Sequence, residues 1–172
     1  MRMLGLLMAA AAVSSLATGS MQLHSTDFAP GGVIPRTLAA VECGGGNRTP
    51  ALSWTGVPNG VRSFALVMHD PDAPVPGGFY HWIVYNLPAK ARMLATDPGL
   101  PWSELGEAST GRQGYFGPCP PPKSKHHYVF TLYALDIERI VTRSPLTAAQ
   151  LQQRIEGHVI ARAALSGTAS SP

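Results

Sequence analysis

Residues 70–87 read DPDAPVPGGFYHWIVYNL, and this stretch decides how the chain is expected to fold. It follows the apolar run Ser63–Met68. Residues 71–78 are rich in proline, which fixes φ, and in glycine, which permits positive φ, so they predict a shaped loop between two strands. The second strand, Phe79–Leu87, carries His81 among aromatic and β-branched neighbours.

A second turn-rich stretch, residues 114–122, also leads to histidine, at His126 and His127, followed by Tyr128. Two proline-stiffened loops, each next to histidine, predict one polar pocket at one end of a β-fold. The alternative is that both stretches are ordinary surface turns whose histidines are satisfied by neighbouring groups.

The N-terminal residues 1–19 have a positive start, an apolar run and then small residues, which predicts a secretory signal peptide cleaved after Ala17 or Gly19. A membrane anchor is the alternative, but the apolar run is shorter than the roughly 20 residues that span a bilayer. We therefore expect no integral membrane span and an exported protein, periplasmic or secreted. It would contain one domain at 20–167 and a flexible tail at 168–172.

The charge pattern argues against a nucleic-acid partner. The chain of 172 residues has 13 basic and 10 acidic side chains, and the basic ones are scattered along it. A nucleic-acid-binding protein usually gathers them on one face or in one run. The length is sufficient for a single domain with a substantial core.

The chain has two cysteines, Cys43 and Cys119, and both lie in loops rich in glycine and proline. In an exported protein, an even pair of this kind is typical of a disulfide. Two unrelated buried thiols are the alternative.

Near the C-terminus, Thr147 and Gln150 have the spacing of a capping box and predict the start of a helix. An apolar stripe that would pack on a sheet then recurs at every fourth residue, at Leu151, Ile155, Val159 and Ala163. Strands with Gly/Pro turns and a terminal helix favour a β-sandwich or barrel with helical decoration.

A carboxylate, Asp70, beside two imidazoles, His81 and His126, has three chemical interpretations. The first is an anion site, with Tyr128 and backbone N–H groups as further donors. The second is a metal site, which lacks the usual closely spaced ligand motif. The third is a hydrolase, but no serine lies in a GxSxG motif. We rank them in this order, and expect His127 to face away from His126 because strand residues alternate.

Several motifs in order along the chain resemble the phosphatidylethanolamine-binding protein family, in its bacterial Raf-kinase-inhibitor-like branch. The resemblance extends from about Met21 to Gly167. The motifs are DPDAP at 70–74, HW at 81–82 with NLP at 86–88, GY at 114–115 with GP at 117–118, HHY at 126–128, and YALD at 133–136.

The resemblance implies an antiparallel β-sandwich with short helices and a C-terminal helix. It also implies a small pocket for phosphate, a phosphoethanolamine-like head group or a carboxylate, without a cofactor or metal. The residues that match the family's pocket are Asp70, Pro74, His81, His126 and Tyr128, with Trp82, Gly117 and Pro118 in support. The resemblance places Cys43 and Cys119 in loops beside this pocket, which favours the disulfide. Relatives often form homodimers.

One loop departs from the family pattern. The usual Pro-Pro-x-Gly-x-His appears here as residues 120–126, PPPKSKH, with Ser124 in place of glycine and one residue more. Lys123 and Lys125 add positive charge there. We expect a non-enzymatic binding protein. The alternatives are a protein–protein module, such as a protease inhibitor, and an acid/base hydrolase that uses the same pocket residues.

Overall fold

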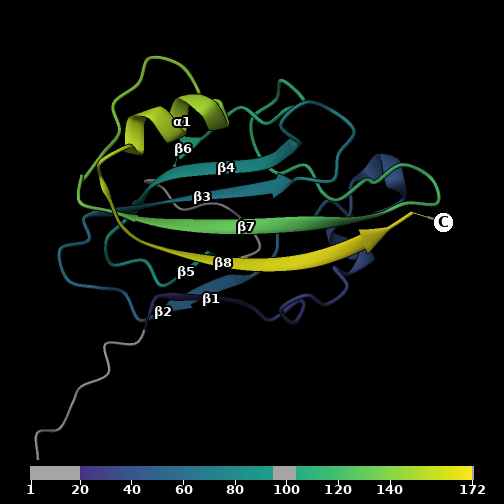
Figure 1. Ribbon diagram of the computed structural model, residues 1–172, viewed down its shortest axis with the longest axis horizontal. Helices are drawn as coiled ribbons and strands as arrows, with labels where there is room; N and C mark the ends of the chain where they lie inside the picture. The colour runs from purple at the N-terminus through teal and green to yellow at the C-terminus, as the bar shows by residue number, and fades with distance from the viewer. Residues whose placement is uncertain (1–19, 95–103, 172) are drawn as a thin grey trace, which may run out of the picture.

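Two antiparallel β-sheets form the structure, which is a computed structural model that describes residues 20–94 and 104–171 (Figure 1). The smaller sheet has the order β1-β2-β5 and the larger sheet has the order β6-β4-β3-β7-β8. The strands and helices are β1 Gln22–Ser25, η1 Arg36–Leu38, η2 Val41–Cys43, β2 Leu52–Thr55, β3 Ser63–Asp70, β4 Phe79–Pro88, β5 Met93–Leu94, β6 Glu104–Leu105, β7 Lys125–Leu135, α1 Ala148–Ile155 and β8 Val159–Ser170. The predicted mainly-β sandwich is confirmed, whereas the expected signal peptide, residues 1–19, lies outside the described residues.

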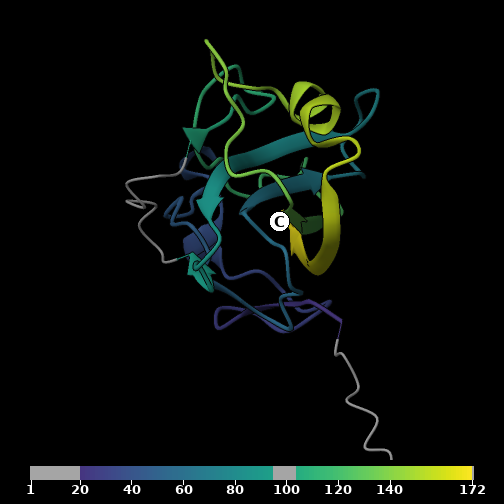
Figure 2. The same cartoon turned by 90° about the vertical axis from the view of Figure 1, so that its left-hand side faces the viewer.

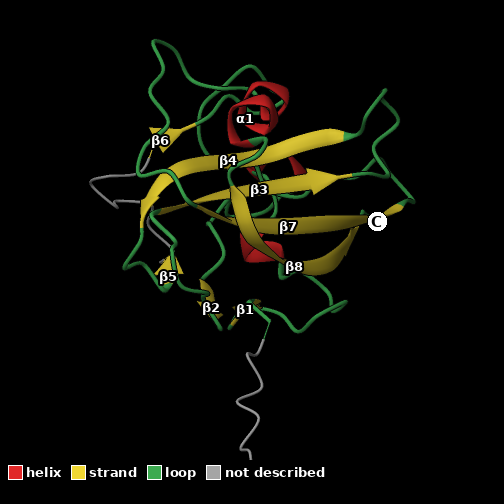
Figure 3. Cartoon of the chain, turned by 60° about the vertical axis from the view of Figure 1, so that its left-hand side comes forward, coloured by secondary structure: helices red, strands yellow, loops and turns green. Residues whose placement is uncertain are grey.

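The larger sheet is covered on both faces (Figure 1, Figure 3). One face packs against the smaller sheet through a core that includes Trp54, Phe64 and Phe130. The other face packs against α1, whose Leu151 and Ile155 belong to a second core. Burial on both faces explains why the central strands are continuous apolar runs instead of alternating ones.

The helix α1 begins where the sequence predicts. The side chain of Thr147 accepts a hydrogen bond from the backbone N–H of Gln150, and the Gln150 side chain accepts one from the Thr147 N–H. These reciprocal bonds form the expected capping box. The helix near the C-terminus is therefore confirmed over Ala148–Ile155.

The predicted extension of this helix through Val159 to Ala163 is wrong. Gly157 has φ 79°, a left-handed conformation that ends a helix, and the chain then enters β8. β8 pairs with β7 up to Ser170, so residues 168–170, which the sequence assigned to a flexible tail, belong to the larger sheet.

Connecting segments meet at one end of the larger sheet. Figure 2 turns the molecule by 90°, and the two short helices η1 and η2 are seen on the same side of that sheet as β1 and β2. The loop that contains η1 and η2 contacts the proline-rich loop before β7 through the hydrogen bond from the Ala40 N–H to the Pro118 carbonyl. No helix within residues 20–94 and 104–171 is long and apolar enough to cross a bilayer.

Candidate functional site

Three neighbouring strands bring the predicted polar residues to one end of the larger sheet. Asp70 ends β3, His81 lies near the start of β4, and His126 and Tyr128 lie near the start of β7. β3 pairs antiparallel with both β4 and β7, so its final residue meets the first residues of its two neighbours. Side chains more than fifty positions apart in the chain are therefore placed together.

A β-bulge turns His81 toward this cluster. A register shift beside Met68 and His69 leaves His81 as an extra residue in β4. Its neighbour Trp82 faces the core between the two sheets, so strict alternation would direct His81 to the opposite face. The extra residue breaks that alternation, and His81 Nε2 lies 4.0 Å from Asp70 Oδ2.

Both carboxylate oxygens of Asp70 accept hydrogen bonds. Oδ2 is 2.8 Å from Nδ1 of His126, and Oδ1 accepts the backbone N–H of Asp72 at 2.9 Å. The second imidazole has a different partner, because Nδ1 of His81 lies 2.8 Å from the carbonyl oxygen of Phe116. Each ring is thus oriented by an oxygen on its Nδ1 side, and no hydrogen bond to Nε2 of either ring is found among the described residues.

The cluster is almost fully buried: Asp70 is 3% exposed, His81 4%, His126 6% and Tyr128 0%. Burial lowers the pKa of His81, although the Phe116 carbonyl and the Asp70 carboxylate oppose that shift. Burial, together with the Asp70 carboxylate, raises the pKa of Tyr128, so its hydroxyl keeps its proton. Little of each side chain is therefore in contact with solvent.

The hydroxyl of Tyr128 is the unusual group in the cluster. It is buried and makes no hydrogen bond of normal geometry among residues 20–94 and 104–171, although the Asp70 carboxylate and the Cys119 backbone lie close enough to influence its pKa. The Tyr128 ring packs edge-on against His81, with ring centroids 5.1 Å apart. Most buried hydroxyl groups in proteins are hydrogen-bonded, so one without a partner beside other polar groups requires an explanation, such as a bound water, an ion or a catalytic role.

The disulfide Cys43–Cys119 is present and joins two loops next to the cluster. The predicted pairing of the two cysteines is therefore found in the structure. Gly117 and Pro118 lie immediately before Cys119, and a side chain at Gly117 would collide with the backbone of residues 38–40. The glycine thus allows the two loops to touch.

Asn47 reinforces the same junction, and sequence reasoning did not single it out as a site residue. Its Nδ2 donates to the Tyr115 carbonyl at 3.1 Å, and its Oδ1 accepts the Gly117 N–H at 2.8 Å. The Tyr115 hydroxyl donates to the Leu38 carbonyl at 2.9 Å. Asn47 has φ 48°, a conformation that asparagine tolerates better than most residues, and this is the one local signal in its favour.

Two phenylalanines flank the buried imidazole. The ring of Phe79 lies 4.8 Å from that of His81, and the ring of Phe116 stacks on His81 at 5.8 Å, measured between centroids. Sequence reasoning missed both as site residues. Aromatic residues in strands and loops are typical of ordinary packing, so the pattern contains no signal for their position.

His127 follows His126 on β7 but lies outside the cluster, and it has its own acidic partner. Nδ1 of His127 lies 2.7 Å from Oδ2 of Asp72, which also accepts the His127 N–H at 2.8 Å. These two hydrogen bonds from His127 lower the pKa of Asp72. His127 is exposed while His126 is buried, which confirms the predicted alternation.

The remaining predicted residues lie in two environments. Trp82 is fully buried in the core between the sheets and meets the Tyr115 ring edge-on at 5.4 Å, so its core-facing position is as expected. Pro74 is exposed in the loop after β3. No hydrogen bond or ring contact among the described residues connects Pro74 with the cluster.

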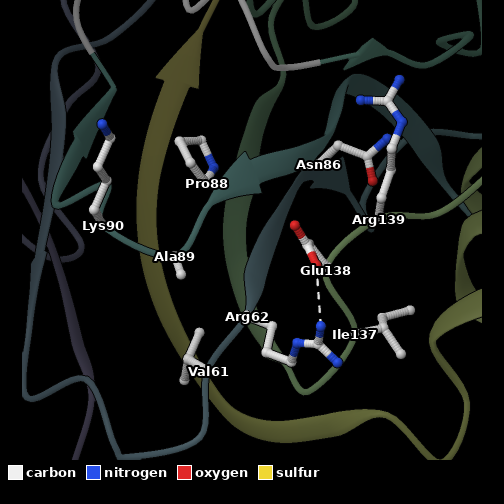
Figure 4. Close-up of a pocket in the computed structure, with 9 residues that line it drawn as sticks. All are labelled: Val61, Arg62, Asn86, Pro88, Ala89, Lys90, Ile137, Glu138 and Arg139. Atoms are coloured by element: carbon white, nitrogen blue, oxygen red, sulfur yellow. Dashed lines mark hydrogen bonds and ion pairs between the residues drawn. The ribbon is translucent and has the colours of Figure 1, made fainter.

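The described surface has several hollows, and two of them lie at opposite ends of the larger sheet. One of about 350 Å³ is adjacent to the cluster and includes Pro118, Lys125 and Ala169, the last of which pairs with His126 across β7 and β8. Another, of about 910 Å³, lies at the opposite end of the sheet (Figure 4). There the Arg62 side chain is paired with Glu138 at 3.0 Å, so the charges of the second hollow are partly compensated.

A metal is not supported by the arrangement of side chains. Among residues 20–94 and 104–171, no group of three histidine, cysteine or acidic side chains is arranged to hold a metal ion. In the cluster, the closest approach of carboxylate and imidazole is a hydrogen bond, which uses the Nδ1 atom of His126.

Comparison with known proteins identifies the family and the fold. The sequence profile of the phosphatidylethanolamine-binding protein family matches residues 24–170, which include the whole cluster. The chain belongs to this family.

Bacterial relatives confirm the predicted branch. YbcL of Escherichia coli is 39% identical over 132 residues, covering 72% of each chain. Its crystal structure, described as a new member of the mammalian PEBP family, covers 90% of this chain and 100% of its own at a TM-score of 0.83 and 32% identity. The PEBP homologue CT736 of Chlamydia trachomatis aligns with a TM-score of 0.80 and 37% identity, over 89% of this chain and 99% of its own.

LppC, a candidate lipoprotein of Mycobacterium tuberculosis, is 38% identical over 149 residues, which cover 86% of this chain and 71% of LppC.

Proposed function

We propose that this protein is a non-enzymatic binding protein whose ligand is a small oxoanion or an oxoanion-bearing head group. The ligand site is formed by Asp70, His81, His126 and Tyr128. Phosphate, a phosphoethanolamine-like head group and a carboxylate all have an oxygen that can accept a hydrogen bond from the Tyr128 hydroxyl. Membership of the phosphatidylethanolamine-binding protein family supports the same ligand class.

The buried hydroxyl of Tyr128 is the observation that carries the proposal. Within the part of the chain that the structure describes, it makes no hydrogen bond of normal geometry, and it lies next to two imidazoles and a carboxylate. Leaving a buried polar group unpaired costs on the order of 1–3 kcal/mol, and an anion oxygen within reach of the hydroxyl would remove that cost. The cluster also has no activated nucleophile beside the imidazoles, which favours binding over hydrolysis.

Histidine NMR during a titration with sodium phosphate tests the site. We expect the ring resonances of His81 and His126 to shift together in the millimolar range, and Tyr128→Phe to weaken the response. The matched control is His158→Gln, because His158 pairs with Asp136 at 2.8 Å but is exposed and lies outside the cluster. If the rings of His81 and His126 do not respond in a folded protein at tens of millimolar phosphate, the proposed site is wrong.

We also propose that the protein is exported. The signal-like residues 1–19, the disulfide and the similarity to LppC support this location. Mass spectrometry of the protein from a periplasmic or secreted fraction should give a mature N-terminus after Ala17 or Gly19. Full-length protein that begins at Met1 and remains inside the cell would contradict export.

A further inference from the structure

The hydrogen bonds of the cluster fix where each imidazole carries its proton. A carbonyl oxygen only accepts, so His81 must donate from Nδ1 to the Phe116 carbonyl, 2.8 Å away. An ionised carboxylate also only accepts, so His126 must donate from Nδ1 to Asp70 at 2.8 Å. A neutral imidazole has a single N–H. Both neutral rings therefore leave Nε2 as an acceptor.

This arrangement does not suit a fully ionised anion. The neutral cluster has two acceptor Nε2 atoms and the negative charge of Asp70, and the Tyr128 hydroxyl is the one side-chain donor left among the four residues. An oxoanion without hydrogens is itself an acceptor and is repelled by a buried carboxylate. The four side chains therefore offer such a ligand a single donor, and an additional hydrogen on one imidazole would supply a second.

We infer that the cluster binds an anion together with a proton, and that a fully ionised oxoanion is bound only when His126 takes up one proton from solvent at Nε2. The inference rests on the proposed function. No bond of the ligand is made or broken: the solvent proton joins the Nε2 lone pair, and the new N–H donates to a ligand oxygen. The His126 imidazolium is then held between the Asp70 carboxylate and the anion.

Two acidic groups face the His126 ring. Asp70 from β3 contacts it directly, and Asp72 from the following loop lies close enough to interact with it. Lys125 precedes it on β7 and is exposed, while β8 places the uncharged Ala169 opposite it. Two other titratable rings face the carboxylate: His81, whose Nε2 lies 4.0 Å from Asp70, and Tyr128, whose pKa is raised by burial and by the Asp70 charge.

The same reasoning specifies the ligand class. His81 remains an acceptor at Nε2, because burial lowers its pKa and disfavours its charged form. A ligand with its own acidic hydrogen, such as hydrogen phosphate or a phosphomonoester monoanion, supplies the donor that this nitrogen lacks. We therefore expect the site to prefer acidic oxoanions over diesters and sulfate, which carry no hydrogen at neutral pH.

The first test uses dimethyl phosphate, an anion without an ionisable hydrogen near neutral pH. We expect its dissociation constant, measured by NMR titration at pH 6.5, 7.5 and 8.5, to rise roughly tenfold per pH unit above the histidine range, since one proton is taken up. The nitrogen-15 shifts of His126 in the complex at pH 7.5 should show both ring nitrogens protonated. His126→Gln should remove the pH dependence, and His158→Gln should keep it.

Three results would overturn the inference. Binding of dimethyl phosphate with a constant affinity from pH 6.5 to 8.5 excludes proton uptake but leaves the proposed anion site intact. A complex in which His81 carries the added proton excludes the assignment to His126. No response to phosphate or to dimethyl phosphate contradicts the proposed function as well.

The second test compares methyl phosphate with dimethyl phosphate at pH 5.5, where the monoester is largely a monoanion with one acidic hydrogen. Both ligands have the same charge and nearly the same size, so the comparison isolates the hydrogen. We expect methyl phosphate to bind at least tenfold more tightly, and His81→Asn to reduce that ratio. Equal affinities of the two ligands would show that His81 Nε2 does not accept a ligand hydrogen.

Discussion

Removal of the disulfide Cys43–Cys119 is expected to lower the free energy of unfolding by about 2–4 kcal/mol. The bond links residues separated by 76 positions, and chain entropy alone gives about 4.5 kcal/mol for a loop of that size. We place the expected value below that limit because the denatured chain keeps some residual structure. For a domain of this size, the change corresponds to a fall in Tm of roughly 5–15 °C.

The measurement compares urea unfolding of the oxidised protein with that of the double variant Cys43→Ala/Cys119→Ala, which avoids a free thiol. Oxidised protein treated with a reductant is the control, and it should resemble the variant. Because Asn47 still links the two loops by its own hydrogen bonds, we expect anion affinity to change by less than tenfold. A loss of stability below 1 kcal/mol would refute the reasoning, since the loop would then be constrained equally well without the bond.

Three further predictions concern single side chains. Asn47→Ala removes two hydrogen bonds and places alanine at φ 48°, so we expect the free energy of unfolding to fall by about 2–3 kcal/mol in chemical denaturation. Asn47→Gly should lose less, because glycine adopts positive φ without strain. Equal losses for the two variants would contradict the backbone contribution. Thr147→Ala removes the cap of α1 and should cost about 1 kcal/mol, and no change in Tm would contradict the capping role. Burial lowers the folded-state pKa of His81, so the unfolded chain binds more protons, and the free energy of unfolding of the ligand-free protein should fall as the pH drops below about 6.5. His81→Asn should flatten this limb of the pH profile, and identical profiles would disprove the assignment.

Local sequence predicted the strands better than it predicted the end of the last helix. The central strands were identified because they are long apolar runs between turn residues. The apolar stripe from Leu151 to Ala163 led to a helix that was predicted too long. A spacing of four residues fits the 3.6-residue period of a helix and also the two-residue period of a strand. Gly157 and the β-branched pair Val159-Ile160 were the available signals for a strand, and they coincide with the start of β8.

The sequence predicted which residues form the cluster, but it did not predict how the His81 side chain is oriented. The sequence indicated Asp70, His81 and His126 as neighbours, and the structure places them together. Alternation separated His126 from His127 correctly. It could not place His81, because the bulge that reorients this residue depends on pairing with β3 and leaves no local sequence signal.

The DPD motif at 70–72 and the HH motif at 126–127 are joined by hydrogen bonds. Asp70 and Asp72 are two residues apart, and each pairs with one of the adjacent residues His126 and His127, which alternation directs to opposite faces of β7. The Asp72 N–H also donates to Asp70, so the exposed pair and the buried pair share a loop. The exposed pair, in contact with water, contributes at most about 1 kcal/mol. The buried pair has little solvent around it to stabilise its charges. A proton or an anion that reaches this pair therefore interacts with it more strongly than it would with the exposed pair. This difference suits two nearly identical Asp–His contacts, one residue apart on the same strand, to different roles: the exposed pair fastens a loop, and we propose that the buried pair responds to a ligand.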